Sequence, residues 1–336
     1  MDPLSQGTVA AAFAQSTANK DNILKIGVIG FLAGLVPDLD VVIQSSTDPI
    51  LFLEYHRQFT HSLFFIPFGS FFISLLLFPL VKRSMNFKTV YLASLLGYAT
   101  HGILDACTSY GTQLFWPFSN ERVAWNNISI IDPLFTIPVL ILLGITIKSK
   151  KKIFSFFAIG WITFYLSLGF VQYERTLSAA IELAKSRGHN PERLTLKPSF
   201  GNLILWKSIY QHKETFYVDA IRTIQSSTWC PGESIRVFDY EKHLPGLDED
   251  SQQTKDIERF RWFSQDYLGY DEEKNIITDV RYSMIPNQID PMWGLAIDVQ
   301  LDINEHAIWW TSRSLDQSQL DLFKDLLKGR KCTTSS

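Results

Sequence analysis

Residues 63–81, with the sequence LFFIPFGSFFISLLLFPLV, contain nineteen residues without a charged side chain. A helix needs roughly 20 mainly apolar residues to cross the ~30 Å hydrocarbon core of a membrane. A second stretch, IFSFFAIGWITFYLSLGFVQY at residues 153–173, contains twenty-one uncharged residues. Both stretches therefore predict transmembrane helices.

Four shorter apolar stretches accompany these two. Residues 89–104 and 133–147 have polar side chains at their edges, so they predict membrane spans that line something polar. Residues 3–19 and 26–37 are uncharged and rich in small residues, which is typical of a tightly packed hairpin or a re-entrant pair. Residues 1–173 are therefore expected to form a polytopic transmembrane helical bundle.

From residue 174 onward the hydrophobic pattern changes period. Apolar and polar residues alternate in two runs, 203–210 and 215–221, which predict a β-hairpin. Similar runs occur at residues 234–240, 276–282 and 295–301, and the leucines of residues 315–328 have helical spacing. Residues 174–336 are therefore expected to form a soluble, antiparallel β-rich domain with a C-terminal helix. The fold class that follows is α+β.

Composition excludes some functions and leaves others open. The net charge of -3 and the absence of a basic stripe give no indication of nucleic-acid binding. The three cysteines, Cys107, Cys230 and Cys332, have neither the number nor the spacing of a disulfide framework or a thiolate metal site. Cys230 and Cys332 could pair if their domain is exported.

Positive charge predicts the orientation in the membrane, because basic loops stay in the cytoplasm. Lysine and arginine concentrate in three connections between apolar stretches: Lys20, Lys25, Lys82, Arg83, Lys88, Lys148, Lys150, Lys151 and Lys152. If each stretch crosses once, these connections share one side. Residues 38–61, 105–132 and the C-terminal domain then lie on the other side, which makes that domain extracytoplasmic.

Histidines and aspartates gather where apolar stretches meet that second side. They occur in the motifs PDLD (37–40), HRQFTHS (56–62), HGILD (101–105) and IDP (131–133). Ionisable side chains near a bilayer are costly unless they are paired or ligated. His101 and Asp105, four residues apart on a helix, can share a cation. A mixed set of imidazoles and carboxylates suits zinc or manganese better than magnesium or calcium.

A structural interpretation competes at each position. A lone Asp or His at a helix end is as often a cap or a solvated interfacial residue. Asp132 before Pro133 is best explained as a helix N-cap. Arg57 could anchor the interface or pair with Glu54. A metal site is favoured by the gathering of His56, His61 and His101 with Asp38, Asp40 and Asp105 at one membrane face.

The stretches MDPLSQGTVAAAFAQ, PDLD, HRQFTHS, HGILDACTSYGTQLFWPFS and ISIIDPLFT together resemble the DUF457 or YdjM-like family of membrane-bound metal-dependent hydrolases. The resemblance covers residues 1–175 and is most specific at residues 101–119. It implies a helical domain in a bacterial-type inner membrane and a hydrolase activity of undefined substrate. The pattern is similar, more distantly, to zinc-dependent phospholipases C, which implies Asp38, His61, His101 and Asp105 as metal ligands.

One departure from the family pattern concerns Ser5 and Gln6, which stand where many relatives have a Thr-His pair. Glutamine is a poor metal ligand, so this chain would hold a single ion or bind it more weakly.

The leading hypothesis is a hydrolase in which a divalent cation, zinc first, activates water against an ester or phosphoester of a lipid-like substrate. Asp40 or His56 would serve as a further ligand or general base, and Arg57 would hold an anionic phosphate. The alternative is a non-catalytic membrane protein with a structural ion and a partner-binding soluble domain. A transporter is less favoured, because the ionisable residues lie at one face instead of crossing the bilayer.

Overall fold

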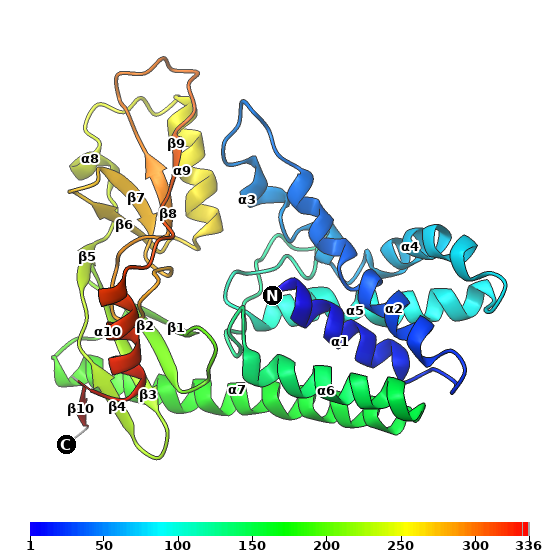
Figure 1. Ribbon diagram of the computed structural model, residues 1–336. Helices are drawn as coiled ribbons and strands as arrows, with labels where there is room; N and C mark the ends of the chain where they lie inside the picture. Colours follow the sequence, from blue (N-terminus) through cyan, green and yellow to red (C-terminus); the bar gives the residue numbers. More distant parts are fainter. Residues whose placement is uncertain (331, 335–336) are drawn as a thin grey trace. The chain divides into compact units, whose positions relative to one another are not determined.

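The computed structural model describes residues 1–330 and 332–334, and the chain divides into two compact units (Figure 1). Unit 1 comprises Met1–Val42, Tyr55–Val171 and Phe200–Asn202. Unit 2 comprises Ile43–Glu54, Gln172–Ser199 and the chain from Leu203 onward. Unit 1 is helical and unit 2 contains antiparallel sheets, so the expected α+β class is confirmed.

Unit 1 is built from helices joined by short 3-10 turns. In chain order they are α1 (Pro3–Gln15), α2 (Ile23–Ala33), η1 (Val36–Val42), η2 (Phe59–His61), α4 (Ile66–Val81), α5 (Phe87–Cys107), α6 (Pro133–Ser149) and the first part of α7 (Ile153–Ser186). The short helix α3 (Leu51–Tyr55) lies where the chain returns from unit 2 to unit 1. Asp132 accepts hydrogen bonds from the first backbone N–H groups of α6, so it is the N-cap that Pro133 predicted.

Small residues let α1, α2 and α5 pack with their backbones close together. A Cβ atom on Gly30 would lie 2.3 Å from the Cβ of Ala14, and one on Gly34 would lie 2.3 Å from the Cβ of Ala10. A Cβ atom on Gly97 of α5 would lie 2.4 Å from the carbonyl oxygen of Gly30. This small-residue spacing of four is typical of helix packing in membranes.

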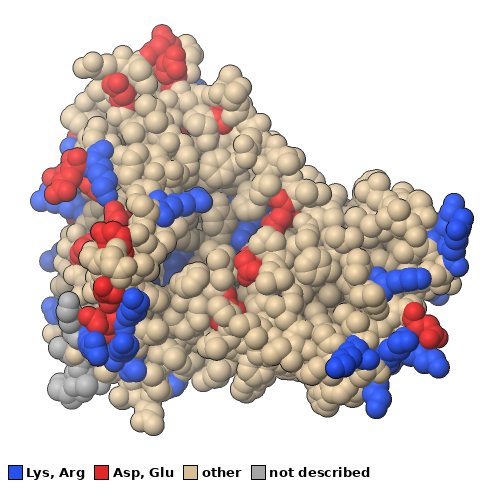
Figure 2. Space-filling view, viewed as in Figure 1, with Lys and Arg blue, Asp and Glu red and all other residues tan. Residues whose placement is uncertain are grey.

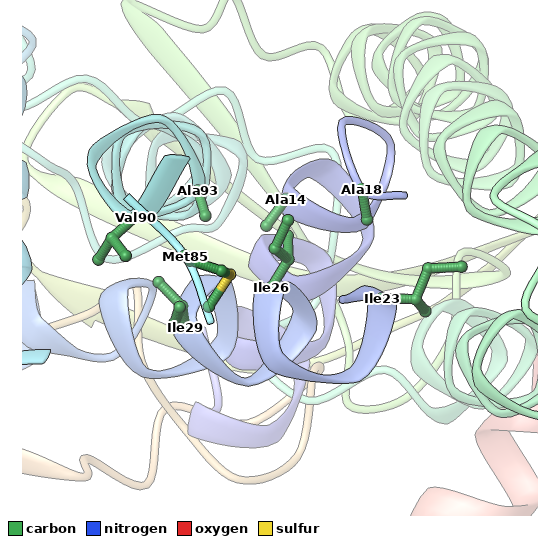
Figure 3. Packing of buried hydrophobic residues seen from close by; sticks show 8 residues of the cluster. All are labelled: Ala14, Ala18, Ile23, Ile26, Ile29, Met85, Val90 and Ala93. Atoms are coloured by element: carbon green, nitrogen blue, oxygen red, sulfur yellow. The ribbon is translucent and has the colours of Figure 1, made fainter. Parts of the chain in front are cut away.

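Buried apolar residues pack together where the C-terminal end of α1 meets α2 and the first turns of α5 (Figure 3). They come from α1, α2, α5 and the α4–α5 connection: Ala14, Ala18, Ile23, Ile26, Ile29, Met85, Val90 and Ala93. The packing fixes α2 against α5 along its length, and it thereby positions η1, which follows α2, beside the C-terminal turns of α5.

Helix length and composition together support fewer membrane crossings than the sequence predicts. Among the described residues, α7 is the one helix that is both long and apolar enough to cross a membrane. Residues Leu51–His61 and Ile66–Val81 pass the same test together, but they are bent by 83° at a break. The stretch expected to span at residues 63–81 therefore becomes helical only at Ile66. The apolar helix α6, with 17 residues, is shorter.

The lysines of unit 1 concentrate at one end. On the face shown in Figure 2, Lys and Arg gather where the connections α1–α2, α4–α5 and α6–α7 lie, beside a broad surface without charge. Lys20, Lys150, Lys151 and Lys152 line one surface pocket, so two of these connections are adjacent. We call this end, with Lys20, Lys25, Lys82, Arg83, Lys88, Lys148 and Lys150–Lys152, the basic end.

Unit 2 contains two antiparallel sheets. The first has the order β1-β2-β3-β4-β10 with β5 beside β3, and its strands are β1 (Arg193–Pro198), β2 (Leu205–His212), β3 (Thr215–Thr223), β4 (Ser227–Cys230), β5 (Ser234–Arg236) and β10 (Thr333–Thr334). The second has the order β6-β7-β8-β9, and its strands are β6 (Leu268–Asp271), β7 (Ile276–Asp279), β8 (Trp293–Ala296) and β9 (Ile308–Thr311). Cys230 and Cys332 form a disulfide.

The predicted β2–β3 hairpin and the helix α10 (Gln317–Leu327) are confirmed. Other boundaries differ from the expectation. The run 234–240 forms only the short strand β5 before the helix α8 (Tyr240–His243), and the run 295–301 leaves the sheet after Ala296. The helix α9 (Gln252–Phe263) was not predicted.

Candidate metal centre

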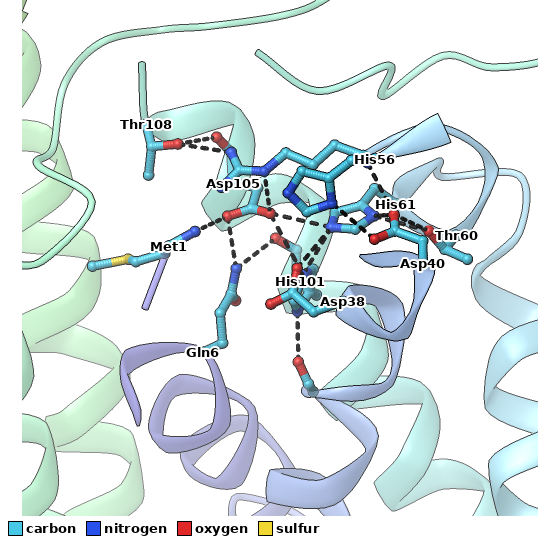
Figure 4. A network of polar contacts seen from close by, with 12 residues as sticks. Met1, Gln6, Asp38, Asp40, His56, Thr60, His61, His101, Asp105 and Thr108 are labelled. Atoms are coloured by element: carbon cyan, nitrogen blue, oxygen red, sulfur yellow. Dashed lines mark hydrogen bonds and ion pairs between the residues drawn. The ribbon is translucent and has the colours of Figure 1, made fainter. Parts of the chain in front are cut away.

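Four side chains of unit 1 converge at the end of α5 that lies opposite the basic end. Asp38 comes from η1, His61 from η2, and His101 and Asp105 from the last turns of α5 (Figure 4). One ligand atom of each lies within 4.8 Å of those of the other three. We call these four residues the His/Asp cluster. His61, His101 and Asp105 are buried, whereas the side chain of Asp38 is 27% exposed.

Gly102 explains why η2 can lie against α5. A Cβ atom at this position would fall 2.0 Å from the carbonyl oxygen of His61. Any other residue would therefore push His61 away from its neighbour His101. Tyr98, one turn earlier on α5, donates a hydrogen bond of 2.7 Å to the carbonyl of Thr60 and holds the same segment.

The distances within the His/Asp cluster resemble the edges of a coordination tetrahedron. The Nε2 atoms of His61 and His101 are 3.0 Å apart. Asp38 Oδ1 lies 3.4 Å from His61 Nε2 and 3.3 Å from His101 Nε2. Asp105 Oδ2 lies 3.2 Å and 3.5 Å from the same two nitrogens. Ligands bound tetrahedrally at about 2.0–2.2 Å would be separated by about 3.3–3.6 Å.

Hydrogen bonding at the other ring nitrogens fixes which atoms carry lone pairs. His101 Nδ1 lies 2.5 Å from the carbonyl oxygen of Gly34, which can only accept, so Nδ1 carries the hydrogen. His61 Nδ1 lies 3.0 Å from Thr60 Oγ1 and 3.2 Å from Asp40 Oδ2. Thr60 donates its own hydroxyl hydrogen to Asp40, so Nδ1 of His61 is also the donor. In the neutral rings both Nε2 atoms then present lone pairs to each other, which is the arrangement that metal-binding histidines adopt.

Asp105 supplies the most deeply buried carboxylate. Its Oδ1 accepts a hydrogen bond of 2.9 Å from Gln6 and also contacts the amino group of Met1. Within the described residues its Oδ2 accepts no hydrogen bond, although Arg57 Nε lies 3.2 Å away. Arg57 and the Met1 amino group therefore already bring positive charge to this buried carboxylate, which burial would otherwise make costly. Gln6 thus contacts the cluster as a hydrogen-bond donor and not as a ligand.

Asp40 lies behind His61 and is surrounded by donors. It accepts from His56 Nδ1 at 2.8 Å and from Thr60 Oγ1 and the backbone N–H of Arg57 at 2.9 Å each. Burial opposes ionisation, but the hydrogen bonds from His56 and His61 outweigh it and hold the pKa of Asp40 below its usual range. Asp40 is thus placed to orient His61 and His56.

Arg57 brings a positive charge to the edge of the cluster. Its backbone is left-handed, with φ of 64°, which is uncommon for a residue with a side chain. The guanidinium donates to Thr108 Oγ1 at 3.1 Å and lies 4.9 Å from the centre of the Tyr110 ring. The buried Arg122 lies against the same ring at 5.5 Å. Arg122, Thr60 and the Gly34 carbonyl also belong to this site, and the sequence alone does not predict them.

Unit 2 contains another group of metal-compatible side chains, Asp48, Asp256 and His306. Here Arg259 donates to Asp48 at 2.7 Å and to Asp256 at 3.0 Å. A guanidinium therefore already supplies the positive charge that a cation would bring, and this group is explained as an ion-pair network.

Unit 1 is thus a helical domain with one basic end and, at the other end, a buried His/Asp cluster that forms a candidate metal centre. The sequence pattern of the YdjM inner membrane protein family matches residues 1–176, and the chain belongs to this family. The resemblance inferred from the motifs is thereby confirmed, and so is a membrane location. The matched region contains every residue of the His/Asp cluster.

The uncharacterized protein YfhP of Bacillus subtilis (strain 168) is 34% identical to this chain over 119 residues. The match covers 35% of this chain and 36% of YfhP, so the chain spans about a third of that relative's length. No solved structure matches the chain.

Proposed function

We propose that this YdjM-family protein is a multi-pass, metal-dependent hydrolase of the inner membrane that acts on an ester or phosphoester of a lipid-like substrate. The observation that carries the proposal is the pair of imidazole Nε2 atoms 3.0 Å apart. Two lone pairs at this distance repel each other unless a proton or a cation lies between them. Carboxylate oxygens of Asp38 and Asp105 lie within 3.5 Å of the same two nitrogens. A divalent cation between them could contact all four atoms at once, whereas a proton would bridge only one pair.

Asp38, His61, His101 and Asp105 would hold the ion. Zinc suits a mixed set of imidazoles and carboxylates better than magnesium or calcium, which favour oxygen ligands alone. When bound, such an ion would lower the pKa of a water molecule to about 7 and polarise the scissile group.

His56 is the best candidate for the general base. Its Nδ1 faces Asp40, which leaves Nε2 free to accept a proton, and its side chain is 20% exposed. Asp40 would act through His56 and His61 as a positioning residue, because its oxygens are already occupied by donors. Arg57, with its planar donor fork, would hold an anionic oxygen of the substrate.

The polarity of unit 1 supports a multi-pass arrangement with an extracytoplasmic unit 2. The basic end and the His/Asp cluster lie at opposite ends of α5, whose 21 residues span about 31 Å. Basic loops favour the cytoplasm. The Cys230–Cys332 disulfide is typical of an oxidising compartment, which supports the same orientation for unit 2.

The test is to purify the full chain in detergent, measure its metal content, and assay a panel of lipid esters and phosphoesters. We expect about one divalent ion per chain and metal-dependent turnover. His56→Ala should keep the ion and lose turnover, which separates the base from the ligands. Protein that carries no ion under zinc-preserving conditions would refute the proposal.

A structural metal is the second candidate, and one observation favours it. Four protein ligands close a tetrahedral site, whereas catalytic zinc sites usually keep one position for water. Asp38 is the partly exposed member of the cluster and would have to yield that position. Bound zinc without turnover on the whole panel would favour a non-catalytic protein whose unit 2 binds a partner.

A further inference from the structure

Helices α1, α5 and α7 leave a groove of about 260 Å³ between them within unit 1. The lining side chains are apolar apart from Thr100, and they include Val9, Phe13, Leu96, Ala99, Leu104 and Ile162. The hydroxyl of Thr100 donates to the Gly97 carbonyl at 2.8 Å, so it is satisfied within its own helix. The groove therefore offers a ligand hydrophobic contact only.

The chemistry of the walls selects the occupant. Apolar cavities exclude water and bind hydrocarbon. The groove lies in the membrane-family region of the chain, where the surrounding solvent is lipid tails. An acyl chain is the ligand that matches both the walls and the surroundings.

The position of the groove relates it to the His/Asp cluster. Gln6, Val9 and Phe13 are three and four residues apart and share one face of α1. Gln6 donates to Asp105, whereas Val9 and Phe13 line the groove. On α5, Leu104 lines the groove directly before Asp105. The groove therefore begins within about one helical turn of the cluster.

From Leu104 the groove follows α5 back to Leu96, a distance of about 12 Å toward the basic end. A lipid with its head group at the cluster would extend its chain in this same direction, away from the end where the ionisable residues gather.

We propose that this groove holds one acyl chain of the substrate, so that the substrate class is a lipid with a hydrolysable head group. The inference rests on the proposed hydrolase function and specifies its substrate. Recognition would then divide between the ionic head, held at the cluster and Arg57, and the chain, held between α1, α5 and α7.

The experiment uses the full chain in detergent, with a series of p-nitrophenyl phosphodiesters that differ only in chain length. For the wild type, kcat/KM should rise with chain length. Ala99→Trp fills the groove and should lower kcat/KM for the longest substrate roughly tenfold or more, because buried hydrocarbon contact is lost. For the shortest substrate, which has no chain to place in the groove, kcat/KM should fall much less, so the ratio of the two kcat/KM values is the readout. Leu76→Trp, at a position 72% exposed on α4, is the matched control and should change neither.

Ile162→Ala enlarges the groove instead of filling it, and it should shift the preference toward longer or branched chains. A second readout is independent of turnover. A phospholipid with a diazirine in its acyl chain should label α1, α5 or α7 beside the groove in the wild type, and Ala99→Trp should lose this labelling.

The outcomes separate the two proposals. If kcat/KM is independent of chain length and no label is found at the groove, the acyl-chain site is wrong and the hydrolase function still stands. Labelling at the groove without turnover of any substrate would overturn the hydrolase and the substrate assignment with it.

Discussion

The two facing imidazoles show how a few residues determine the candidate site. His101 Nδ1 donates to the Gly34 carbonyl, and His61 Nδ1 faces Asp40 and Thr60. These contacts at Nδ1 fix the tautomer of each ring. The spacing of His101 and Asp105 predicted a shared helix face, and their ligand atoms lie 3.5 Å apart. The Gly34 carbonyl could not be predicted, because a backbone acceptor has no sequence signal.

The first prediction concerns the ligands. His101→Ala and Asp105→Ala should each lose the bound metal while the protein still inserts into the membrane, because each removes one ligand of four and leaves the helices intact. Metal content of the purified variants is the measurement. His243→Ala is the control, since His243 accepts the hydrogen bond from Asp239 in unit 2 and should keep full metal content. Unchanged metal in all three variants would rule out this site.

The second prediction concerns Gly102. Gly102→Ala places a Cβ 2.0 Å from the His61 carbonyl oxygen, so η2 must move and His61 must leave the cluster. We expect a loss of metal affinity and a destabilisation of about 1–3 kcal/mol, as for overpacked sites. Gly144→Ala on α6 is the matched control, because nothing lies within 4 Å of its added Cβ. It should leave metal binding unchanged and stabilise the helix slightly. Equal metal affinity in the two variants would contradict the packing argument.

At the scale of elements, predictability followed the hydrophobic pattern. The β2–β3 hairpin was predictable because its alternation matches one buried face. The helix α9 was missed because its buried residues include Gln253 and Asp256, which pair with Asp298 and His306 from another segment. No local pattern reveals polar residues that are buried by distant partners. The break before Ile66 could not be predicted for a different reason, because the apolar run continues through it without a change of pattern.

The third prediction concerns the buried lysines of the β1–β2 pair, where Lys197 lies opposite Lys207. Burial lowers the pKa of Lys207 to about 7 from 10.5. Between these values the unfolded chain binds the extra proton, so the free energy of unfolding should rise with pH from 7 to 10. Lys207 alone contributes up to about 1.4 kcal/mol per pH unit.

Thermal unfolding of the detergent-purified protein, followed by tryptophan fluorescence between pH 7 and 10, measures this dependence. Lys207→Met should weaken it, and the difference between the two proteins isolates Lys207 from other titrating groups such as Lys197. Parallel curves for the wild type and the variant would mean that Lys207 keeps an ordinary pKa.

At the scale of the whole molecule, the helical half and the sheet-containing half could be separated from the sequence because their hydrophobic patterns differ: long uncharged stretches occur before residue 173 and alternating runs after it. The number of membrane crossings was less predictable. Helix α5 has the length to cross but carries His101 and Asp105, and α4 is preceded by a sharp bend. Apolar length alone does not distinguish a crossing from a helix that lines a polar site, since both bury apolar residues.

The last prediction concerns topology and uses two fusion points that bracket α7, the helix with the length and composition of a membrane span. A reporter fused after residue 152 should be active in its cytoplasmic form, because Lys148 and Lys150–Lys152 favour that side. A reporter fused after residue 336 should be active in its extracytoplasmic form. The Cys230–Cys332 disulfide offers an independent readout, since thiol alkylation of the protein in intact cells should leave both sulfurs unmodified until a reductant is added. A cytoplasmic signal from both fusions would mean that α7 does not cross the membrane, and the His/Asp cluster would then have to be reached from the cytoplasm.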